Sequence, residues 1–144
     1  MSGNSDGKIM ATISCVTFNH AAYIRQALDS FLMQKTDFEY EILVHDDAST
    51  DGTGDILREY ERKYPGKVRP LIQTENQYSQ GIDNISGAFN FPRARGKYIF
   101  MCDGDDYFVS PDKLQKQVDY METHPDCTLC IHSAKIHLEG KALT

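Results

Sequence analysis

Three aspartates, Asp103, Asp105 and Asp106, directly follow the apolar run at residues 98–102. Carboxylates packed this closely repel one another unless a cation lies among them, and Mg²⁺ or Mn²⁺ prefers oxygen ligands of this kind. A divalent ion held by one or two protein carboxylates keeps positions open for substrate phosphates. An acidic turn is the alternative, since Gly and Asp are common turn residues. Because these acids end a predicted buried strand, we interpret them as a site for a metal ion and a diphosphate.

A second acidic pair, Asp46 and Asp47, follows another predicted strand. In open α/β sheets, ligands bind at the carboxyl edge, so both acidic segments would border one crevice. A nucleotide fits such a crevice, because one carboxylate can accept a base N–H while the other cluster holds the metal on the diphosphate. Phe18, after the first strand, offers a flat face for stacking a base. The alternatives are a simple loop pair for the acids and a core position for Phe18.

The elements that must position these side chains alternate along the chain. Apolar, β-branched runs predict strands, and apolar residues at helical spacing predict helices. The expected strands are residues 11–18, 40–44, 68–73, 97–102 and 127–137, and the expected helices are residues 23–34, 53–64, 85–93 and 110–123. This alternation predicts an α/β fold of three layers, a mostly parallel sheet with helices on both faces.

Turn and cap signals separate the elements. Ser110 and Pro111 predict a hydroxyl cap and the first position of the last helix. The segment at residues 49–51 is consistent with a turn and a helix cap. Gly87 and Pro92 weaken the helix expected at residues 85–93.

Length and charge narrow the class of protein. A chain of 144 residues is expected to form one domain, with residues 1–10 as a flexible lead-in and residues 11–144 as the folded part. With 15 Lys and Arg against 21 Asp and Glu, the formal charge of −6 argues against a nucleic-acid binder. An acidic protein that binds a diphosphate needs a cation between its own carboxylates and the phosphates. No apolar run reaches the ~20 residues that span a bilayer.

The four cysteines are expected to be structural. Cys15 and Cys102 lie in apolar runs, where cysteine behaves as a small buried hydrophobe. Cys127 and Cys130 have the spacing of a redox or zinc motif, but no second pair or histidine partner stands at the expected distance. Reduced thiols in a cytoplasmic protein fit this usage.

Four segments in order carry a resemblance to a known family. They are Thr-Phe-Asn at 17–19, His-Asp-Asp-Ala-Ser-Thr-Asp-Gly-Thr at 45–53, Ala-Arg-Gly-Lys-Tyr-Ile at 94–99, and Asp-Gly-Asp-Asp at 103–106 followed by Pro-Asp-Lys-Leu. From residue 11 to about 125 the chain resembles the inverting family 2 glycosyltransferases, which have the Rossmann-like GT-A fold. The match is specific because the motifs keep both their order and their spacing.

The resemblance implies a role for each matching position. Asp47 would bond to a uracil-type base, with Asp46 as a second candidate, and Phe18 occupies the usual aromatic position. Asp103 and Asp105 match the DxD motif that binds ribose and the metal-bridged diphosphate. Asp105 or Asp106 would ligate the cofactor, Mn²⁺ or Mg²⁺.

The resemblance is looser elsewhere. Arg95 and Lys97 fall near segments that face phosphates in the family. The usual Asn-x-Gly signal after the third strand is present only as Asn76 and the more distant Gly81, so the sugar-facing loop is unassigned.

The resemblance implies metal-assisted transfer of a sugar from a UDP-type donor to a saccharide or lipid-linked acceptor hydroxyl, with inversion, in polysaccharide biosynthesis. The family's catalytic base and acceptor-binding half follow the DxD helix, and the base is expected beyond Thr144. We therefore interpret the chain as the donor-binding part of a longer, cytoplasmic enzyme that meets the inner face of the membrane through other parts or partners. His132 and His137 do not replace the base, because they alternate along the last predicted strand.

Three other classes of protein are alternatives to a glycosyltransferase. A nucleotidyltransferase would need a Gly-rich, basic phosphate loop after the first strand, where residues 19–22 read Asn-His-Ala-Ala. A phosphoacceptor signalling domain would have a Lys on a late strand and would lack Asp-Gly-Asp-Asp. A nucleotide-sugar-binding module without catalysis stays open as the alternative for this chain.

Overall fold

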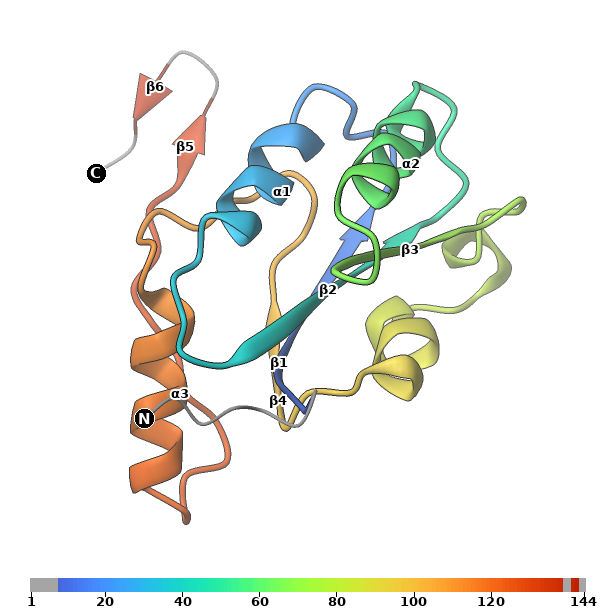
Figure 1. Ribbon diagram of the computed structural model, residues 1–144. Helices are drawn as coiled ribbons and strands as arrows, with labels where there is room; N and C mark the ends of the chain where they lie inside the picture. Colours follow the sequence, from blue (N-terminus) through green and yellow to red (C-terminus); the bar gives the residue numbers. More distant parts are fainter. Residues whose placement is uncertain (1–7, 139–140, 143–144) are drawn as a thin grey trace.

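A four-stranded parallel sheet is the centre of the computed structural model, which describes residues 8–138 and 141–142 (Figure 1). The strands are β1 (Ile9–Thr17), β2 (Glu39–Asp46), β3 (Val68–Ile72) and β4 (Tyr98–Met101). Their order is β3-β2-β1-β4, and every neighbouring pair is parallel. The expected parallel sheet is confirmed. Strand β1 starts at Ile9, and residues 1–7 of the expected lead-in lie outside the described residues.

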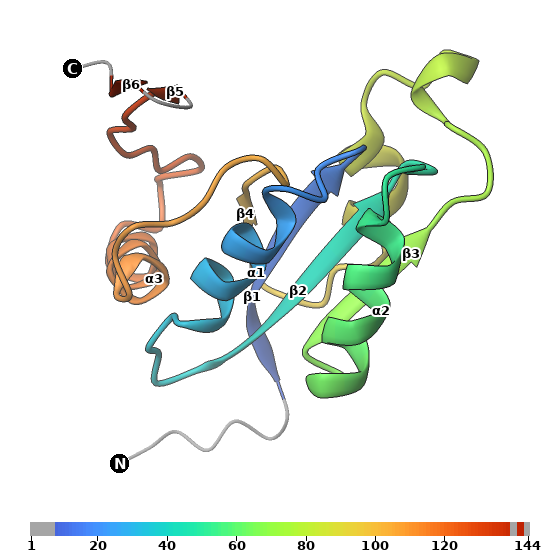
Figure 2. The same cartoon turned by 90° about the horizontal axis from the view of Figure 1, so that it is seen from above.

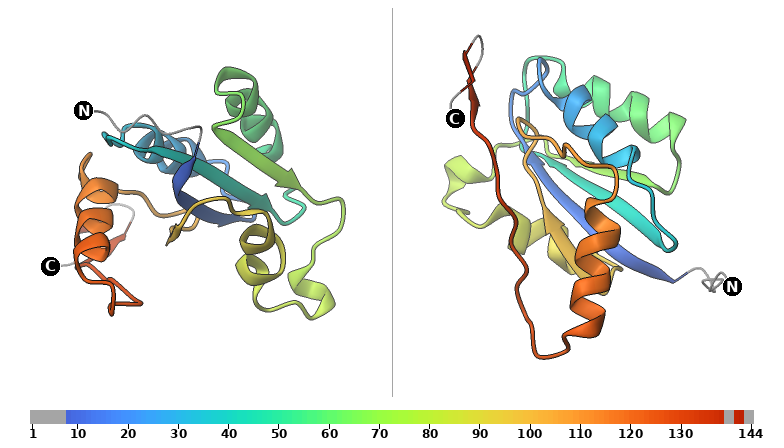
Figure 3. Two further views of the ribbon diagram at one scale, coloured as in Figure 1. Left: turned by 60° about the horizontal axis from the view of Figure 1, so that its bottom comes forward. Right: turned by 90° about the vertical axis from the view of Figure 1, so that its left-hand side faces the viewer.

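Helices cover both faces of the sheet. On one face lie α1 (Ile24–Leu32) and α2 (Thr53–Lys63), and α3 (Lys113–Thr123) lies beyond β4 at the side of α1 (Figure 2). The opposite face carries a π-helical turn, η2 (Ser86–Asn90), and a 3₁₀ turn, η3 (Phe91–Arg93) (Figure 3). The three-layer prediction is confirmed, with an irregular helix where Gly87 and Pro92 oppose a regular one.

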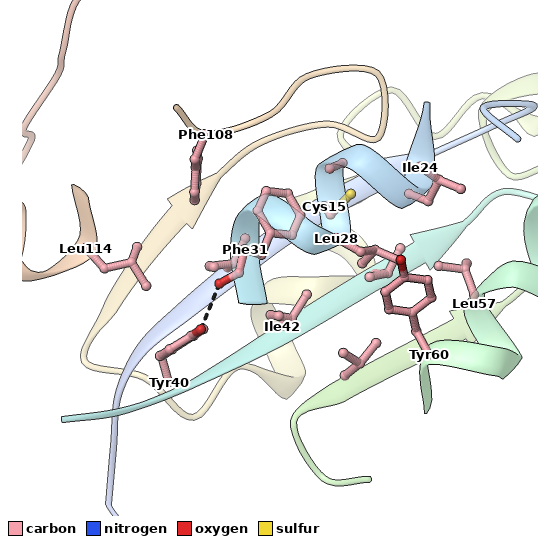
Figure 4. Packing of buried hydrophobic residues seen from close by; sticks show 14 of the residues in the cluster. Cys15, Ile24, Leu28, Phe31, Tyr40, Ile42, Leu57, Tyr60, Phe108 and Leu114 are labelled. Carbon is pink, nitrogen blue, oxygen red and sulfur yellow. Dashed lines mark hydrogen bonds between the residues drawn. The ribbon is translucent and has the colours of Figure 1, made fainter. Parts of the chain in front are cut away.

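The main core lies between the sheet and α1 and α2 (Figure 4). Alternate residues of a strand point to the same face, and Ala11, Ile13 and Cys15 of β1 are fully buried in this cluster. Tyr40 adds a polar anchor, since its hydroxyl donates to the carbonyl of Phe31 at 2.7 Å. Burial of the Cys15 thiol raises its pKa, as expected for a structural cysteine.

The opposite face of the sheet is polar although it is covered. Glu41 of β2 is fully buried there and accepts hydrogen bonds from Thr12 Oγ1 (2.9 Å), Arg69 Nη1 (2.7 Å) and the Arg95 amide (2.7 Å). Because each carboxylate oxygen has a charged or polar donor, the buried charge is compensated. This cluster ties β1, β2 and β3 to the segment before β4.

The start of α3 differs from the prediction. Its N-cap is Asp112, without a side-chain capping bond, and Pro111 precedes the helix instead of opening it. The amide of Leu114 donates to Gln34 Oε1 at 3.0 Å, and Gln34 Nε2 donates to the Ser110 carbonyl at 2.8 Å. A side chain from the segment just after α1 therefore satisfies an amide of the first turn of α3, and the predicted Ser110 cap is wrong.

The strand expected at residues 127–137 is also wrong. Residues 127–136 form no helix or strand, and their apolar side chains Leu129, Ile131 and Ile136 are exposed. No strand of the sheet pairs with them, so backbone pairing is missing. A two-residue strand, β5 (His137–Leu138), instead pairs antiparallel with β6 (Lys141–Ala142). His132 is exposed, and the His137 side chain lies outside what the structure describes.

None of the described helices has the length and apolar character that crossing a bilayer requires. All four cysteines are free, and Cys15 alone is fully enclosed. Burial raises the pKa of Cys102 to about 12, which keeps its thiol protonated at neutral pH.

Candidate functional site

The two acidic segments flank the carboxyl end of β1. The Asp47 amide donates to the Thr17 carbonyl and the Gly104 amide donates to the Val16 carbonyl, each at 3.0 Å. Since β2 and β4 are the two neighbours of β1, these bonds continue the sheet by one step on each side. The segment containing Asp103, Asp105 and Asp106 thus lies at the same edge of the sheet as Asp47, on the other side of β1, as the strand-end pattern predicts.

Gly104 allows this close approach. A Cβ atom at this position would lie 2.6 Å from Thr17 Oγ1 and 2.9 Å from His20 Nδ1, closer than real contacts permit. Only glycine lets the acidic loop lie against the end of β1. Gly104 was not among the predicted site residues, although its place between two aspartates was the available signal.

A cavity of about 620 Å³ opens beside this strand end. It is lined by Val16, Phe18, Asp47, Ala48, Thr50, Asn76, Tyr78, Ser79 and Ile85. Phe18 is 44% exposed, so it is not a core residue and its ring is available for stacking. The cavity joins Phe18 and Asp47, the two positions expected to recognise a base.

The Asp47 carboxylate is nearly buried and well bonded. Its Oδ1 accepts from the Gln77 amide (2.8 Å) and faces His45 Nε2 (3.1 Å), while Oδ2 accepts from the Tyr78 amide (3.1 Å). Burial alone would raise the pKa of Asp47, but these donors outweigh it and hold the pKa below its ordinary value. Asp47 is therefore an ionised acceptor on the cavity wall that also anchors the loop after β3.

Asp46 has a different position. It is 1% exposed and does not line the cavity. Its Oδ1 accepts from the Ser49 amide (3.1 Å) and hydroxyl, which closes the turn after β2. The structure thus gives Asp46 a turn-forming role, and its expected contact with a nucleotide stays a prediction.

The loops after β1 and β2 are bonded to each other. The Asn19 amide donates to Ser49 Oγ at 2.8 Å, and the Thr50 amide donates to Asn19 Oδ1 at 2.8 Å. Asn19 (φ 54°) and Ala48 (φ 65°) adopt left-handed conformations, which cost about 1 kcal/mol for residues other than glycine. Asp51 Oδ1 accepts from the Thr53 amide at 3.1 Å, in agreement with the turn predicted at residues 49–51, but the N-cap of α2 is Gly52, without a side-chain capping bond, so the predicted cap is wrong.

The acid cluster carries unbalanced negative charge. Burial raises the pKa of Asp103, and the charges of Asp105 and Asp106 raise it further; burial and the charge of Asp105 likewise raise the pKa of Asp106. A cation placed here would relieve this repulsion, so the donor set suits a hard divalent ion. Within residues 8–138, however, no three His, Cys, Asp or Glu side chains converge into a complete metal cage.

His20 is a site residue that the sequence analysis missed. Its Nδ1 lies 3.0 Å from Thr17 Oγ1, and its Nε2 lies 3.8 Å from Asp105 Oδ2. It links the end of β1 to the acidic loop. Its position two residues after Phe18 was the only available signal.

Arg95 and Lys97 do not face the site. They precede β4, whereas the acids follow it, and a strand separates the two ends. Arg95 Nη2 pairs with Glu41 at 2.8 Å and Lys97 with Glu122 at 2.5 Å, so the phosphate-facing assignment is wrong. Asn76, by contrast, lines the cavity and donates to the Asp47 carbonyl at 2.9 Å.

By class, the chain is an α/β protein with a parallel sheet and an acidic, aromatic-lined crevice at the carboxyl edge of that sheet. Residues 12–137 match the family described as Glycosyl transferase family 2, and the chain belongs to this family. It has the GT-A fold of the family's solved structures.

Known proteins resemble the chain over most of its length. An uncharacterized protein of Mycobacterium tuberculosis, Rv1520, is 40% identical over 133 residues, which are 91% of this chain and 37% of the relative. TarS of S. aureus, residues 1–349 in complex with UDP-GlcNAc, is 25% identical with a TM-score of 0.65, covering 81% of this chain and 32% of TarS. The mannosyltransferase PcManGT from Pyrobaculum calidifontis, in complex with GDP-Man and Mn²⁺, is 26% identical with a TM-score of 0.62. The match covers 79% of this chain and 32% of PcManGT. The chain therefore spans about a third of the length of these proteins.

Proposed function

We propose that this chain is the donor-binding part of an inverting glycosyltransferase that uses a UDP-type nucleotide sugar and a divalent cation. The observation that carries the proposal is the cavity shared by Phe18 and Asp47 next to the acidic loop at one strand end. Relatives of the same fold are known in complex with UDP-GlcNAc and with GDP-Man and Mn²⁺, which supports a nucleotide-sugar donor.

The base is assigned to the cavity. Phe18 stacks on its face, and the ionised Asp47 accepts an N–H from its edge. Asp47 can only accept, which favours uracil, whose ring N3 carries a proton. The backbone amides of Gln77 and Tyr78 hold this carboxylate in place before the donor arrives.

The diphosphate is assigned to the acidic loop. In this proposal Asp103 contacts the ribose, and Asp105 and Asp106 are the residues that would hold the cation. When bound, a divalent cation acts as a Lewis acid on the departing diphosphate. Gly104 holds the loop against β1, so the carboxylates are positioned before binding.

The transfer step also needs a general base within hydrogen-bond reach of the acceptor hydroxyl. We assign this base, and the acceptor site, to the part of the relatives' length that this chain does not span. In this proposal the chain alone binds the donor and transfers sugar poorly or not at all.

Titration calorimetry with UDP, with and without Mn²⁺, tests the proposal. We expect UDP to bind and Mn²⁺ to strengthen its binding at least about tenfold, because the cation offsets repulsion between the acids and the diphosphate. Equal UDP affinity in both conditions would contradict the metal role, and absence of binding in both would reject the donor site. Hydrolysis of UDP-sugar by a longer protein would separate an enzyme from a binding module without catalysis.

A further inference from the structure

His45 is a buried side chain to which the proposed function gives no role. It lies two residues before Asp47, so both side chains project from the same face of β2 and its continuation. Its exposed fraction is 0%, that of Asp47 is 3%, and His45 Nε2 lies 3.1 Å from Asp47 Oδ1. The contact is thus shielded from solvent and lies directly behind the cavity wall.

The His45 ring has one polar contact among the described residues. Its Nδ1 is buried without a hydrogen-bond partner, and its face packs on Phe89 of η2, with ring centroids 4.7 Å apart and planes inclined by 32°. The ionised Asp47 carboxylate can only accept hydrogen bonds, so the ring must donate to it. The nitrogen that faces Asp47 is Nε2, and Nε2 therefore carries the proton. The ring is therefore a fixed donor aimed at one oxygen of Asp47.

The number of acceptor sites on Asp47 decides what else it can bind. A carboxylate has about four lone-pair sites, two on each oxygen. His45 and the Gln77 amide use Oδ1, and the Tyr78 amide uses one site of Oδ2. One acceptor site on Oδ2 is left for a ligand in the cavity.

We propose that His45 is a positioning residue that sets base selectivity by leaving Asp47 a single acceptor site. This inference rests on the proposed function. Uracil presents one ring N–H at N3, which matches a single acceptor. Cytosine has a bare N3 that repels a carboxylate, beside an amino group that can donate to one. His45 is a third donor beside the Gln77 and Tyr78 amides, so its loss frees an acceptor site on Oδ1 and leaves the carboxylate less firmly held, which lets it turn toward that amino group.

Four proteins test this by calorimetry with UDP and CDP in the presence of Mn²⁺: the unchanged chain, His45→Phe, His45→Gln and His124→Phe. Phenylalanine keeps a ring against Phe89 but has no donor, whereas glutamine can restore an N–H. His124, exposed at the end of α3, is the matched control. We expect His45→Phe to reduce the UDP-over-CDP preference about tenfold, as for loss of one hydrogen bond to a charged group. We expect His45→Gln to keep most of it and His124→Phe to keep all of it.

A second measurement, on the unchanged chain, tests the inference even if His45→Phe fails to fold. In the free, unchanged chain, ¹⁵N NMR of the histidine rings should show His45 protonated on Nε2, and UDP should shift this signal more than CDP does. A folded His45→Phe with unchanged preference, or a His45 ring protonated on Nδ1 alone, would overturn the inference. If the unchanged chain binds neither nucleotide, the proposed function fails, whereas intact UDP preference with an unaffected His45→Phe rejects the positioning role alone.

Discussion

Asp47 and Gly104 lie on opposite sides of one strand end, because their amides bond to the adjacent carbonyls of Thr17 and Val16. This relationship joins a base-recognition element after β2 to an acidic loop after β4. The two halves of the proposed nucleotide site therefore depend on the same two peptide units of β1.

Replacing Gly104 with alanine should separate the acidic loop from β1. The new Cβ would lie 2.6 Å from Thr17 Oγ1 and 2.8 Å from Thr17 Cβ, so the loop must shift. We expect a loss of about 1–3 kcal/mol in unfolding free energy, as for overpacking, and a loss of the Mn²⁺-dependent part of UDP binding. Chemical denaturation and calorimetry measure the two effects.

Gly66→Ala is the control, since Gly66 has a positive φ of 78° but open space where a Cβ would lie. It should lower stability by about 1 kcal/mol and leave UDP affinity unchanged.

Replacing Phe18 with alanine should weaken base binding without loosening the fold. The ring is 44% exposed, and stacking of a base on an aromatic ring is worth about 1–3 kcal/mol. We expect UDP affinity to fall roughly tenfold or more, while the affinity for pyrophosphate with Mn²⁺ stays the same. An equal loss for both ligands would show that Phe18 acts on loop structure and not on the base.

Replacing Asp47 with asparagine should change both stability and base preference. The amide group would set a donor against the Gln77 or Tyr78 amide, and an unsatisfied buried donor costs about 1–3 kcal/mol. Because asparagine can donate to the bare N3 of cytosine, we expect the preference for UDP over CDP to fall. Calorimetry with both nucleotides checks this, and an unchanged preference in a folded variant would remove Asp47 from base recognition.

Single replacements of Asp105 and Asp106 by asparagine should identify the metal ligand. Loss of the ligating carboxylate should lower the Mn²⁺-dependent enhancement of UDP binding by about tenfold or more, whereas the other change should have a smaller effect. Asp55→Asn, in the first turn of α2 and 87% exposed, is the control. If both changes leave the Mn²⁺ effect intact, the acidic loop does not hold the cation.

Glu41 should contribute a pH-dependent part of the stability. Burial opposes its ionisation, but donors from Arg95, Thr12 and Arg69 outweigh this and lower its pKa from an ordinary value of about 4.5. A carboxyl with a lowered folded-state pKa stabilises the fold above the unfolded value, and this contribution is lost as pH falls below about 4.5 through the folded-state pKa.

The corresponding experiment is denaturation of Glu41→Gln at several pH values. We expect a loss of about 2–3 kcal/mol at pH 7 and a smaller loss near pH 3. Glu59→Gln, which removes a half-exposed ion pair with Arg25, should cost less than about 1 kcal/mol. A loss for Glu41→Gln that is the same at both pH values would exclude the linkage.

Much of the fold could be predicted because its signals are local. Apolar runs and helical spacing placed β1 to β4 and α1 to α3 within a few residues, and the alternation predicted a parallel sheet. The elements that were predicted wrongly depend on contacts with distant parts of the chain. Residues 127–136 carry a strand-like pattern but pair with no strand, and the Leu114 amide at the start of α3 donates to Gln34, which lies 80 positions earlier in the chain.

The features of the site likewise divide into those that local sequence determines and those that tertiary contacts decide. The sequence by itself determined the family, the parallel sheet and the two acidic strand ends, because these follow from residue types at short spacings. Only the tertiary structure decided that Asp47 faces the cavity while Asp46 closes a turn, that Gly104 lies against Thr17, and that His45 supports Asp47. The approach of Gly104 to Thr17 joins segments that strand order brings together. The faces of His45, Asp46 and Asp47 follow from the pleat, since a one-residue shift on a strand reverses the face on which a side chain lies.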